Sequence, residues 1–436
     1  MRKQYILQGI VIGAAVFFLS AIGQAQTASQ TTTESGLQDY KRSSLYTVLA
    51  THLSQRYGAQ IDSVFIQLPV PDKYEDHNLP DRYIACPKRE RKISAESMKT
   101  FIDTSEAAKK MVAKWFDRNP ETGTFDLGLV TRRGNYNASE ADVREALLTQ
   151  RGLALIADAG ENLIENTFLI INDIVYVDKE KGAQIASAVF AGLALFSAAT
   201  SVGAAASGNQ DAAEAGVAAA ELAVLGAAIS DAIAGFTVKV TSYLYRLRWN
   251  DSIAAVFYND FWCDTNYAPD EIARRKALFD SLDGQSGLFA LDYVGKYRVK
   301  SDKTVLRGLH DNNDVIRKVC ARALDKNIAA LQKKYEVFKI KSPVTAVNGL
   351  LLQSPIGLKE GLKPSSKFEV LEQRMDEDGH VTYRRTAVVK PIKHLIWDNR
   401  FMAAEEEAAG ADFNATTFKR VGAGQIAPGM LLRQLK

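Results

Sequence analysis

Residues able to perform acid–base, nucleophilic or metal chemistry are few and scattered along this chain. No HExxH motif or i, i+4 histidine pair occurs, and the stretch GQSGLF around Ser286 lacks the spacing of a nucleophile elbow. The acidic run before Gly379 lacks the downstream Glu of a calcium loop. The five histidines therefore read as surface or packing residues: His52, His77, His310, His380 and His394. We expect no catalytic, cofactor-binding or metal site, and we interpret the protein as a non-enzyme.

The three cysteines exclude a disulfide scaffold. Cys86, Cys263 and Cys320 are odd in number and far apart, and no CxxC metal knuckle is present. Two of them could pair in an oxidising compartment, but the sequence does not indicate which two.

The first 25 residues resemble a secretory signal. Arg2 and Lys3 precede an apolar run, and Ala25 occupies the last position of an A-x-A-like cleavage site, so that Gln26 would begin the mature chain. An uncleaved anchor is the alternative. No cysteine lies near the site, which argues against a lipid anchor. We expect an exported protein, located in the periplasm or at the periphery of the outer membrane.

The bulk composition is that of an ordinary globular protein. It is 47% hydrophobic and 24% charged, with a formal net charge of +3. Such a balance does not indicate a nucleic-acid partner.

Helix and strand patterns alternate after a flexible lead-in at 26–39. Apolar spacing predicts a helix over 43–57 and a strand over 61–70, then a helix that begins at Ser94 or Ser97. Further segments predict a strand at 125–133, a helix at about 137–163 and strands at 166–178 and 236–250. We therefore expect a layered α/β domain over 40–295, of α+β or α/β class, with a partly parallel sheet.

An Ala-rich segment at 183–236 interrupts this domain and reads as an inserted helical hairpin. The segment Ala183–Ser207 contains no formally charged residue and is long enough to span a membrane as a helix. The many small residues of 183–236 make the free energy of membrane insertion only weakly favourable, and the acidic residues Glu221 and Asp231 in its second half oppose insertion. Small residues also let helices pack closely. Packing against the sheet or another subunit is the first interpretation, insertion after export is the second, and a disordered or mobile loop is the third.

We single out apolar side chains of this region as candidate contacts with a partner or a membrane. In the hairpin they are Phe190, Leu193, Phe196, Leu222 and Leu225. On the following strand, Tyr243, Tyr245 and Trp249 alternate along one face, which indicates a core or a subunit seam more than a sugar-binding platform.

The last third of the chain changes in character. Residues 296–343 carry thirteen Lys/Arg against five Asp/Glu up to Lys341, and they predict a basic helical connector with an amphipathic helix from Asn313 to Lys334. Residues 344–436 contain short strands and turns, including a hairpin at Asp378-Gly379, and they predict a small β-barrel-like domain.

Two segments resemble known envelope modules. The stretch EADVREALLTQRGLALIADAGENLIENTFLIINDI is similar to the helix-then-strand half of TolB-N-like modules of curli-secretion and flagellar-ring proteins. The stretch IGLKEGLKPSSKFEVLE, within the last ninety or so residues, resembles the SH3-like unit of flagellar assembly protein T. The long Ala-rich insertion and the lack of a lipobox cysteine depart from these patterns. The resemblance implies a non-enzymatic assembly role in the envelope.

The leading hypothesis is an exported scaffold protein without a cofactor, whose partners are envelope proteins or further copies of itself. A membrane-active oligomer that inserts the hairpin, with peripheral membrane contact, is the alternative. An envelope hydrolase without a recognisable motif comes third.

Overall fold

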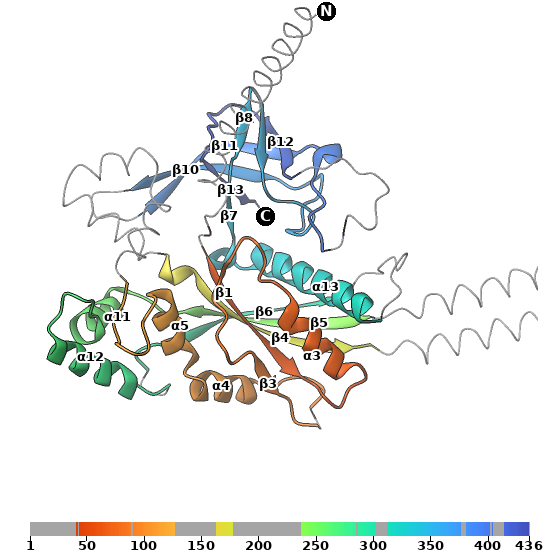
Figure 1. Cartoon of the computed structure of the whole chain (residues 1–436). Helices are drawn as coiled ribbons and strands as arrows, with labels where there is room; N and C mark the ends of the chain where they lie inside the picture. Colours follow the sequence, from red (N-terminus) through yellow and green to blue (C-terminus); the bar gives the residue numbers. More distant parts are fainter. Residues whose placement is uncertain are drawn as a thin grey trace, which may run out of the picture.

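The computed structural model of the chain describes residues 41, 43–88, 90–126, 163–177, 237–284, 287–301, 312–375, 381–401, 403 and 414–435. A mixed sheet flanked by helices forms the larger part, and an antiparallel sheet forms the smaller part (Figure 1). Helices and strands thus mix in an α+β arrangement. The signal segment 1–25, the lead-in 26–39, the helix expected at about 137–163 and the insertion 183–236 lie outside the described residues.

The larger sheet has the strand order β2-β1-β4-β5-β6, and β3 also pairs with β1. Its strands are β1 (Ser44–Thr51), β2 (Glu75–Asp76), β3 (Tyr83–Ala85), β4 (Thr167–Tyr176), β5 (Val238–Leu247) and β6 (Leu291–Lys300). Strands β2, β3 and β4 run parallel to β1, whereas β5 and β6 continue antiparallel. The carboxyl ends of β1, β3 and β4 therefore lie at the same edge of the sheet.

Helices cover both faces of this sheet. On one face lie α3 (Gly58–Gln67) and α13 (Asn312–Lys334), which pack on Leu49, Ile174 and Val240. On the other face lie α4 (Ala95–Thr104), α5 (Ala107–Trp115), α11 (Asp251–Val256), the π-helix Phe257–Phe261 and α12 (Pro269–Ser281). Because both faces are covered, every residue of β1 is buried. Short 3-10 turns occur at Ile164–Asn166, Glu336–Phe338 and Lys393–Leu395.

The smaller sheet is antiparallel throughout, in the order β7-β13-β10-β11-β12-β9-β8. Its strands are β7 (Lys341–Pro343), β8 (Ala346–Asn348), β9 (Leu351–Ser354), β10 (Phe368–Met375), β11 (Val381–Pro391), β12 (Thr416–Val421) and β13 (Leu431–Gln434). Val370, Val389 and Phe418 form the centre of its core. The two outermost strands, β7 and β8, follow each other in the chain. Among the described strands no pairing between β7 and β8 closes the sheet, so the expected barrel is not seen.

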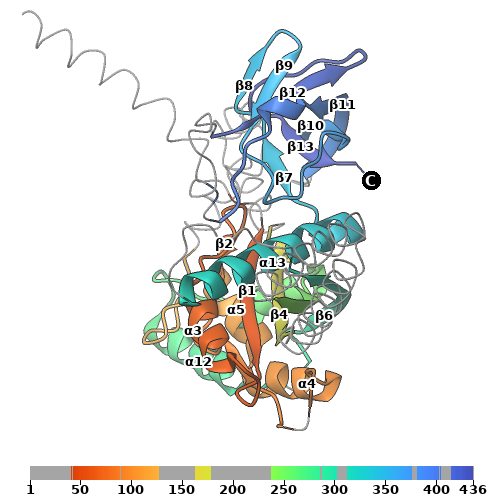
Figure 2. The same ribbon diagram turned by 90° about the vertical axis from the view of Figure 1, so that its right-hand side faces the viewer.

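The two parts meet along α13 and the turn before β7 (Figures 1 and 2). Both Nε and Nη2 of Arg322 on α13 donate to the carbonyl oxygen of Phe401 at 3.0 Å. Lys333 donates to the carbonyl oxygen of Gly361 at 2.9 Å, and Lys359 pairs with Asp72 at 3.3 Å. These polar contacts join the two parts.

The amphipathic helix predicted at 313–334 is present as α13, but it is not a connector. Residues 296–300 belong to β6, and the apolar stripe of α13 is buried on the sheet of the larger part: Ile316, Val319, Ala323, Leu324, Ile328 and Leu331. The basic residues of α13 therefore occupy its outer face, apart from the fully buried Lys318.

Two of the predicted elements near the amino terminus are wrong and in effect exchanged. Residues 44–51, expected to be helical, form the central strand β1. Most of 61–70, expected to be a strand, lies in the helix α3 (Gly58–Gln67). A strand buried on both faces is apolar at nearly every position, so a helical subset of positions can always be found in it. The strands at 166–178 and 236–250 are confirmed as β4 and β5.

Helix starts follow local capping chemistry. The Oγ of Ser94 accepts a hydrogen bond from the Ser97 N–H at 3.1 Å and begins α4, one of the two predicted starts. Glu106 adopts φ 53° and separates α4 from α5. The side-chain oxygen of Asn250 accepts a hydrogen bond from the Ile253 N–H and begins α11.

Candidate functional site

A cysteine, a histidine and an aspartate meet at the edge where the parallel strands end. Thr51 pairs with Ala85 at the last position of β1 and β3, so His52 and Cys86 are the next residues on adjacent strands. The Cys86 N–H donates to the Thr51 carbonyl oxygen at 3.0 Å and extends this pairing. Asp173 lies on β4 opposite Ala50. Three segments far apart in the sequence thus converge on one point.

The three side chains also share one face of the sheet. Successive side chains of a strand point to opposite faces, so residues two positions apart share a face. His52 therefore lies on the same face as Ala50, Cys86 on that of Ile84, and Asp173 on that of Ile171. Ala50, Ile84 and Ile171 all belong to the core under α4 and α5. The sequence spacing therefore places the trio on that side.

His52 and Asp173 form a buried pair. Nε2 of His52 lies 2.7 Å from Oδ1 of Asp173, and their side chains are 6% and 1% exposed. The other carboxylate oxygen of Asp173 accepts the N–H of Ile93 at 3.3 Å. The hydrogen bond to Asp173 and an interaction with the Cys86 side chain raise the pKa of His52 to about 10, against the opposing effect of burial. His52 is therefore an imidazolium at neutral pH, between a carboxylate and a sulfur.

Two further titratable groups surround the pair. Burial raises the pKa of Asp62 on α3 to about 6, and the charge of His52 partly opposes this rise. Burial, with smaller effects of Asp173 and Cys86, raises the pKa of Tyr243 on β5. The buried His52–Asp173 pair thus has an uncharged phenol and a carboxyl of raised pKa within electrostatic range.

All three cysteines are free, but their surroundings differ. Cys86 is partly exposed, between exposed Ala85 and Pro87. Cys263 and Cys320 are buried, and burial raises the pKa of both thiols, that of Cys320 to about 12. Only Cys86 of the three combines solvent access with a charged histidine.

The other histidines of the described chain have different positions. His77 is buried, and its Nε2 lies 2.8 Å from the carbonyl oxygen of Met111, which suits the packing role expected for it. His394 lies in the 3-10 turn Lys393–Leu395. His310 and His380 lie outside the described residues.

Sequence reasoning missed the trio because it interpreted 43–57 as a helix. A usable signal exists, since His52 directly follows the apolar run SLYTVLAT and Cys86 directly follows YIA. Polar residues immediately after buried strands gather at the carboxyl edge of a parallel sheet, where ligand and active sites of open α/β sheets occur.

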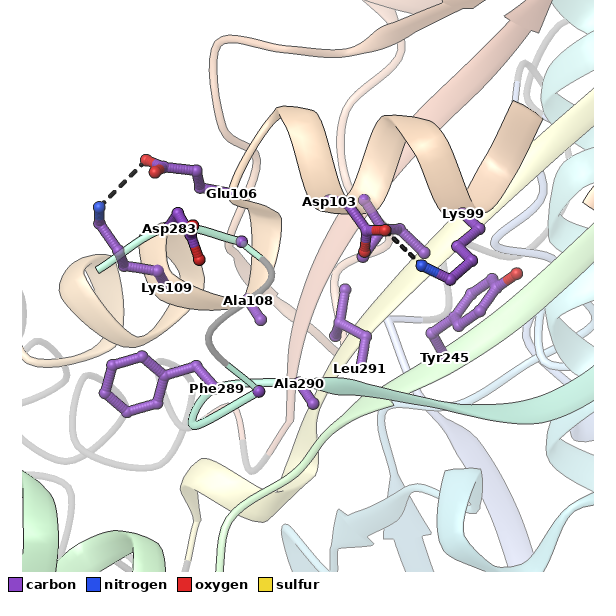
Figure 3. A pocket seen from close by; sticks show the side chains of 13 residues that line it. Lys99, Asp103, Glu106, Ala108, Lys109, Tyr245, Asp283, Phe289, Ala290 and Leu291 are labelled. Carbon is purple, nitrogen blue, oxygen red and sulfur yellow. Dashed lines mark hydrogen bonds and ion pairs between the residues drawn. The ribbon is translucent and has the colours of Figure 1, made fainter. Parts of the chain in front are cut away.

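A larger cleft of about 500 Å³ lies between α4, α5 and the segment 283–291. Figure 3 shows its polar rim: Lys99 faces Asp103, and Lys109 faces Glu106. The N–O distance of the Lys109 pair is 3.2 Å. Asp103 and Glu106 therefore each have a lysine partner on a neighbouring turn, an arrangement common on helix surfaces, and Asp283 is a third carboxylate that lines the cleft (Figure 3). This cleft offers a polar surface rather than an acid–base pair.

A second, small cavity of about 60 Å³ lies where the two parts meet. Asp325 of α13, Arg82, Lys359 and Phe401 are among its lining residues. Burial raises the pKa of Asp325 to about 7, although the charge of Lys359 lowers it. The junction therefore contains a carboxyl group that titrates near neutrality.

The residues proposed from sequence as partner or membrane contacts fall into two groups. Phe190, Leu193, Phe196, Leu222 and Leu225 lie outside the described residues. Tyr243, Tyr245 and Trp249 lie in the core under α4 and α5, at 7%, 9% and 8% exposed. The structure thus places the aromatic set inside the larger part.

Comparison with known proteins gives no relative: no protein-family model matches the chain, and no curated protein sequence matches it. Within the described ranges, no cluster of three or more His, Cys, Asp or Glu side chains is placed to hold a metal ion. Likewise, no helix in the described part is long and apolar enough to cross a membrane.

Proposed function

We propose that this chain is an exported cell-envelope protein that acts in assembly or scaffolding through protein–protein contacts and without catalysis. Its signal peptide would be removed after Ala25, and its partners would be envelope proteins or further copies of itself. The resemblance of 140–174 to TolB-N-like modules and of the last ninety or so residues to an SH3-like unit supports the same role.

The observation that carries this proposal is the position of the Ala-rich insertion. Strands β4 and β5 are antiparallel neighbours, and Tyr176 pairs with Val238 at their ends. The Val177 N–H donates to the Thr237 carbonyl oxygen at 2.8 Å. Residues 178–236 thus leave and re-enter the sheet at one hydrogen-bonded pair.

Such a pair needs only a tight turn, because two residues suffice to connect antiparallel neighbours. A segment of this length is therefore not required to close the sheet. Its apolar, small-residue composition suits close packing against another helix or protein surface. We assign the assembly contact to this segment, with Phe190, Leu193, Phe196, Leu222 and Leu225 as its anchors.

A second candidate is a membrane-active oligomer that inserts the hairpin. The uncharged stretch Ala183–Ser207 favours it, since its length suffices for a span. Glu221 and Asp231 count against it, because an acidic residue at the centre of a helix costs about 2.5–3.5 kcal/mol on insertion. Membrane insertion is therefore less favoured than protein contact.

In-cell cross-linking tests the proposal. The triple variant Phe190→Ser, Leu193→Ser and Phe196→Ser should lose cross-linked species that the unaltered chain forms. Ala188→Ser, Ala191→Ser and Ala194→Ser provide the matched control, since they add the same hydroxyls without removing large side chains, and they should retain those species. Equal cross-linking of all three chains would contradict the assignment.

An alkaline carbonate wash of membranes separates the two candidates. Protein contact predicts that the full chain is released by the wash. If the full chain resists the wash and a chain with 178–236 replaced by Asn-Gly does not, membrane insertion replaces protein contact as the proposed role of this segment.

A further inference from the structure

We propose that Cys86, assisted by His52 and Asp173, is a reactive thiol that exchanges with disulfides, and that it prefers disulfides carrying negative charge. This property goes beyond the assembly role and does not depend on it.

The first support is geometry. Cys86 and His52 are adjacent residues on hydrogen-bonded parallel strands with side chains on one face, and Asp173 holds the imidazole at 2.7 Å. Nε2 of His52 is engaged by Asp173, and the His52 side chain also interacts with the side chain of Cys86. A carboxylate that orients a histidine beside a nucleophile is the arrangement that activates cysteines generally.

The second support is the contrast among the three cysteines. A cationic neighbour favours the thiolate, which is the form that attacks, whereas burial in apolar surroundings makes a thiol inert. Cys86 is partly exposed beside the His52 imidazolium, and Cys263 and Cys320 are buried. Cys86 is therefore the candidate reactive thiol, and the two buried cysteines serve as internal controls.

The structure favours disulfide exchange over acyl transfer at this thiol. Acyl transfer requires free donors for an oxyanion and a cleft for the substrate. The Cys86 N–H is already bonded to the Thr51 carbonyl oxygen, and neither the cleft of Figure 3 nor the cavity at Asp325 is lined by Cys86. Exchange needs only access to the sulfur and a stabilised thiolate.

The sequence next to the thiol indicates the charge of the reactant. Lys88, Arg89, Arg91 and Lys92 follow Cys86 with one acidic residue, Glu90, among them. Lys88, Arg91 and Lys92 are exposed. A local excess of positive charge raises the encounter rate with anions. The fitting reactant is therefore a disulfide that bears carboxylates.

The exchange balances without another reactant. The Cys86 thiol loses its proton to solvent, and the resulting thiolate attacks one sulfur of R–S–S–R. A bond forms between Cys86 Sγ and that sulfur, the S–S bond breaks, and R–S⁻ leaves and takes up a proton from solvent. The product is a mixed disulfide on Cys86, and no net oxidation of the two reactants occurs.

Reaction of the folded full chain with the dianionic 5,5′-dithiobis(2-nitrobenzoate) tests this proposal, with the labelled peptide identified by mass spectrometry. We expect one fast equivalent at Cys86, with a rate at pH 6 about tenfold or more above that of a cysteine in an unstructured peptide. Cys86→Ser should abolish it. A fast equivalent at Cys263 or Cys320, or a rate equal to the peptide's, would overturn the proposal.

Charge and positioning are tested separately. The double variant Lys88→Glu and Lys92→Glu changes two exposed positions. It should react more slowly with the dianionic disulfide and faster with the cationic disulfide cystamine. His52→Asn and Asp173→Asn should each slow the reaction at Cys86 by about tenfold or more. If the preference between the two disulfides does not change, the charge claim fails. If folded His52→Asn reacts as fast as the unaltered protein, the role of His52 fails, and the unaltered chain at pH 6 still decides the reactivity of Cys86.

Discussion

Nε2 of His52 lies 2.7 Å from Oδ1 of Asp173, and both side chains are almost completely withdrawn from solvent. They lie 121 positions apart in the chain and meet only because β1 and β4 are parallel neighbours. Because the pair is buried, the stability of the larger part depends on whether His52 and Asp173 are charged.

Removal of one partner of this pair should destabilise the protein strongly. His52→Ala leaves the Asp173 carboxylate buried without its partner, which costs about 3–5 kcal/mol in the free energy of unfolding. Asp292→Asn is the control, because the Arg248–Asp292 pair is about half exposed and should contribute less than about 1 kcal/mol. Urea unfolding measures both. Similar losses in the two variants would contradict the importance of the buried pair.

Asp62 and Asp325 should each contribute a loss of stability as the pH rises from about 4 to 8. The pKa of Asp62 is raised to about 6 and that of Asp325 to about 7. Each folded-state pKa lies above the unfolded value near 4, so the folded chain binds protons that the unfolded chain has lost. Asp325→Asn should therefore raise the free energy of unfolding at pH 8, by on the order of 1–3 kcal/mol, and change it little at pH 4. Urea midpoints across this range test the difference between the two chains.

The raised pKa of His52 acts in the same direction at higher pH. Its stabilising effect is fully present below about pH 6.5, the unfolded pKa, and is lost as the pH approaches the folded pKa of about 10. In His52→Asn the decline in unfolding free energy between pH 7 and 10 should be smaller than in the unaltered chain. An unchanged slope would show that His52 is not the group that titrates.

Gly295 on β6 should not accept a side chain. Its φ is 154°, and an added Cβ would lie 2.1 Å from the Tyr335 hydroxyl oxygen. That hydroxyl accepts the Lys296 N–H at 3.0 Å, next to the irregular pairing of β5 with β6. Gly295→Ala should cost about 2–4 kcal/mol of unfolding free energy, from backbone strain and displacement of Tyr335. Gly422→Ala is the control, since it has positive φ but open space around it, and it should cost about 1 kcal/mol.

Arg322 should hold the smaller sheet to α13. Its two hydrogen bonds to the Phe401 carbonyl oxygen, both at 3.0 Å, join the parts. Arg322→Ala should speed hydrogen exchange at the junction near 398–401 while leaving the core strands β1 and β10 protected. Arg374→Ala, in an exposed pair with Glu372 within the smaller part, should leave that exchange unchanged.

Much of the fold could be predicted where one periodicity dominates. The stripe of α13 and the strands β4 and β5 are readable because an apolar pattern continues over ten or more residues. The exchange of helix and strand between β1 and α3 shows the limit. In β1 every position is buried, so its pattern carries no period, and α3 is rich enough in Val, Ile and Phe to resemble a strand.

The trio at His52, Cys86 and Asp173 could not be predicted from local pattern. Its members lie on three different strands, and only the parallel pairing of β1 with β3 and β4 brings them together. Because 43–57 is predicted to be a helix, His52 is expected within that helix and not at the end of a strand. Cys86 follows the short apolar stretch YIA, but its relation to a histidine required the sheet order.

The native mass of the complex that mild detergent releases from the envelope tests the central claim most directly. The unaltered chain is compared with a chain in which 178–236 is replaced by Asn-Gly, and light scattering after size separation gives the mass of each. The assembly role predicts a multimeric or mixed complex for the unaltered chain and a folded monomer of the shortened chain. A monomer in both cases, or the same complex in both, would contradict it.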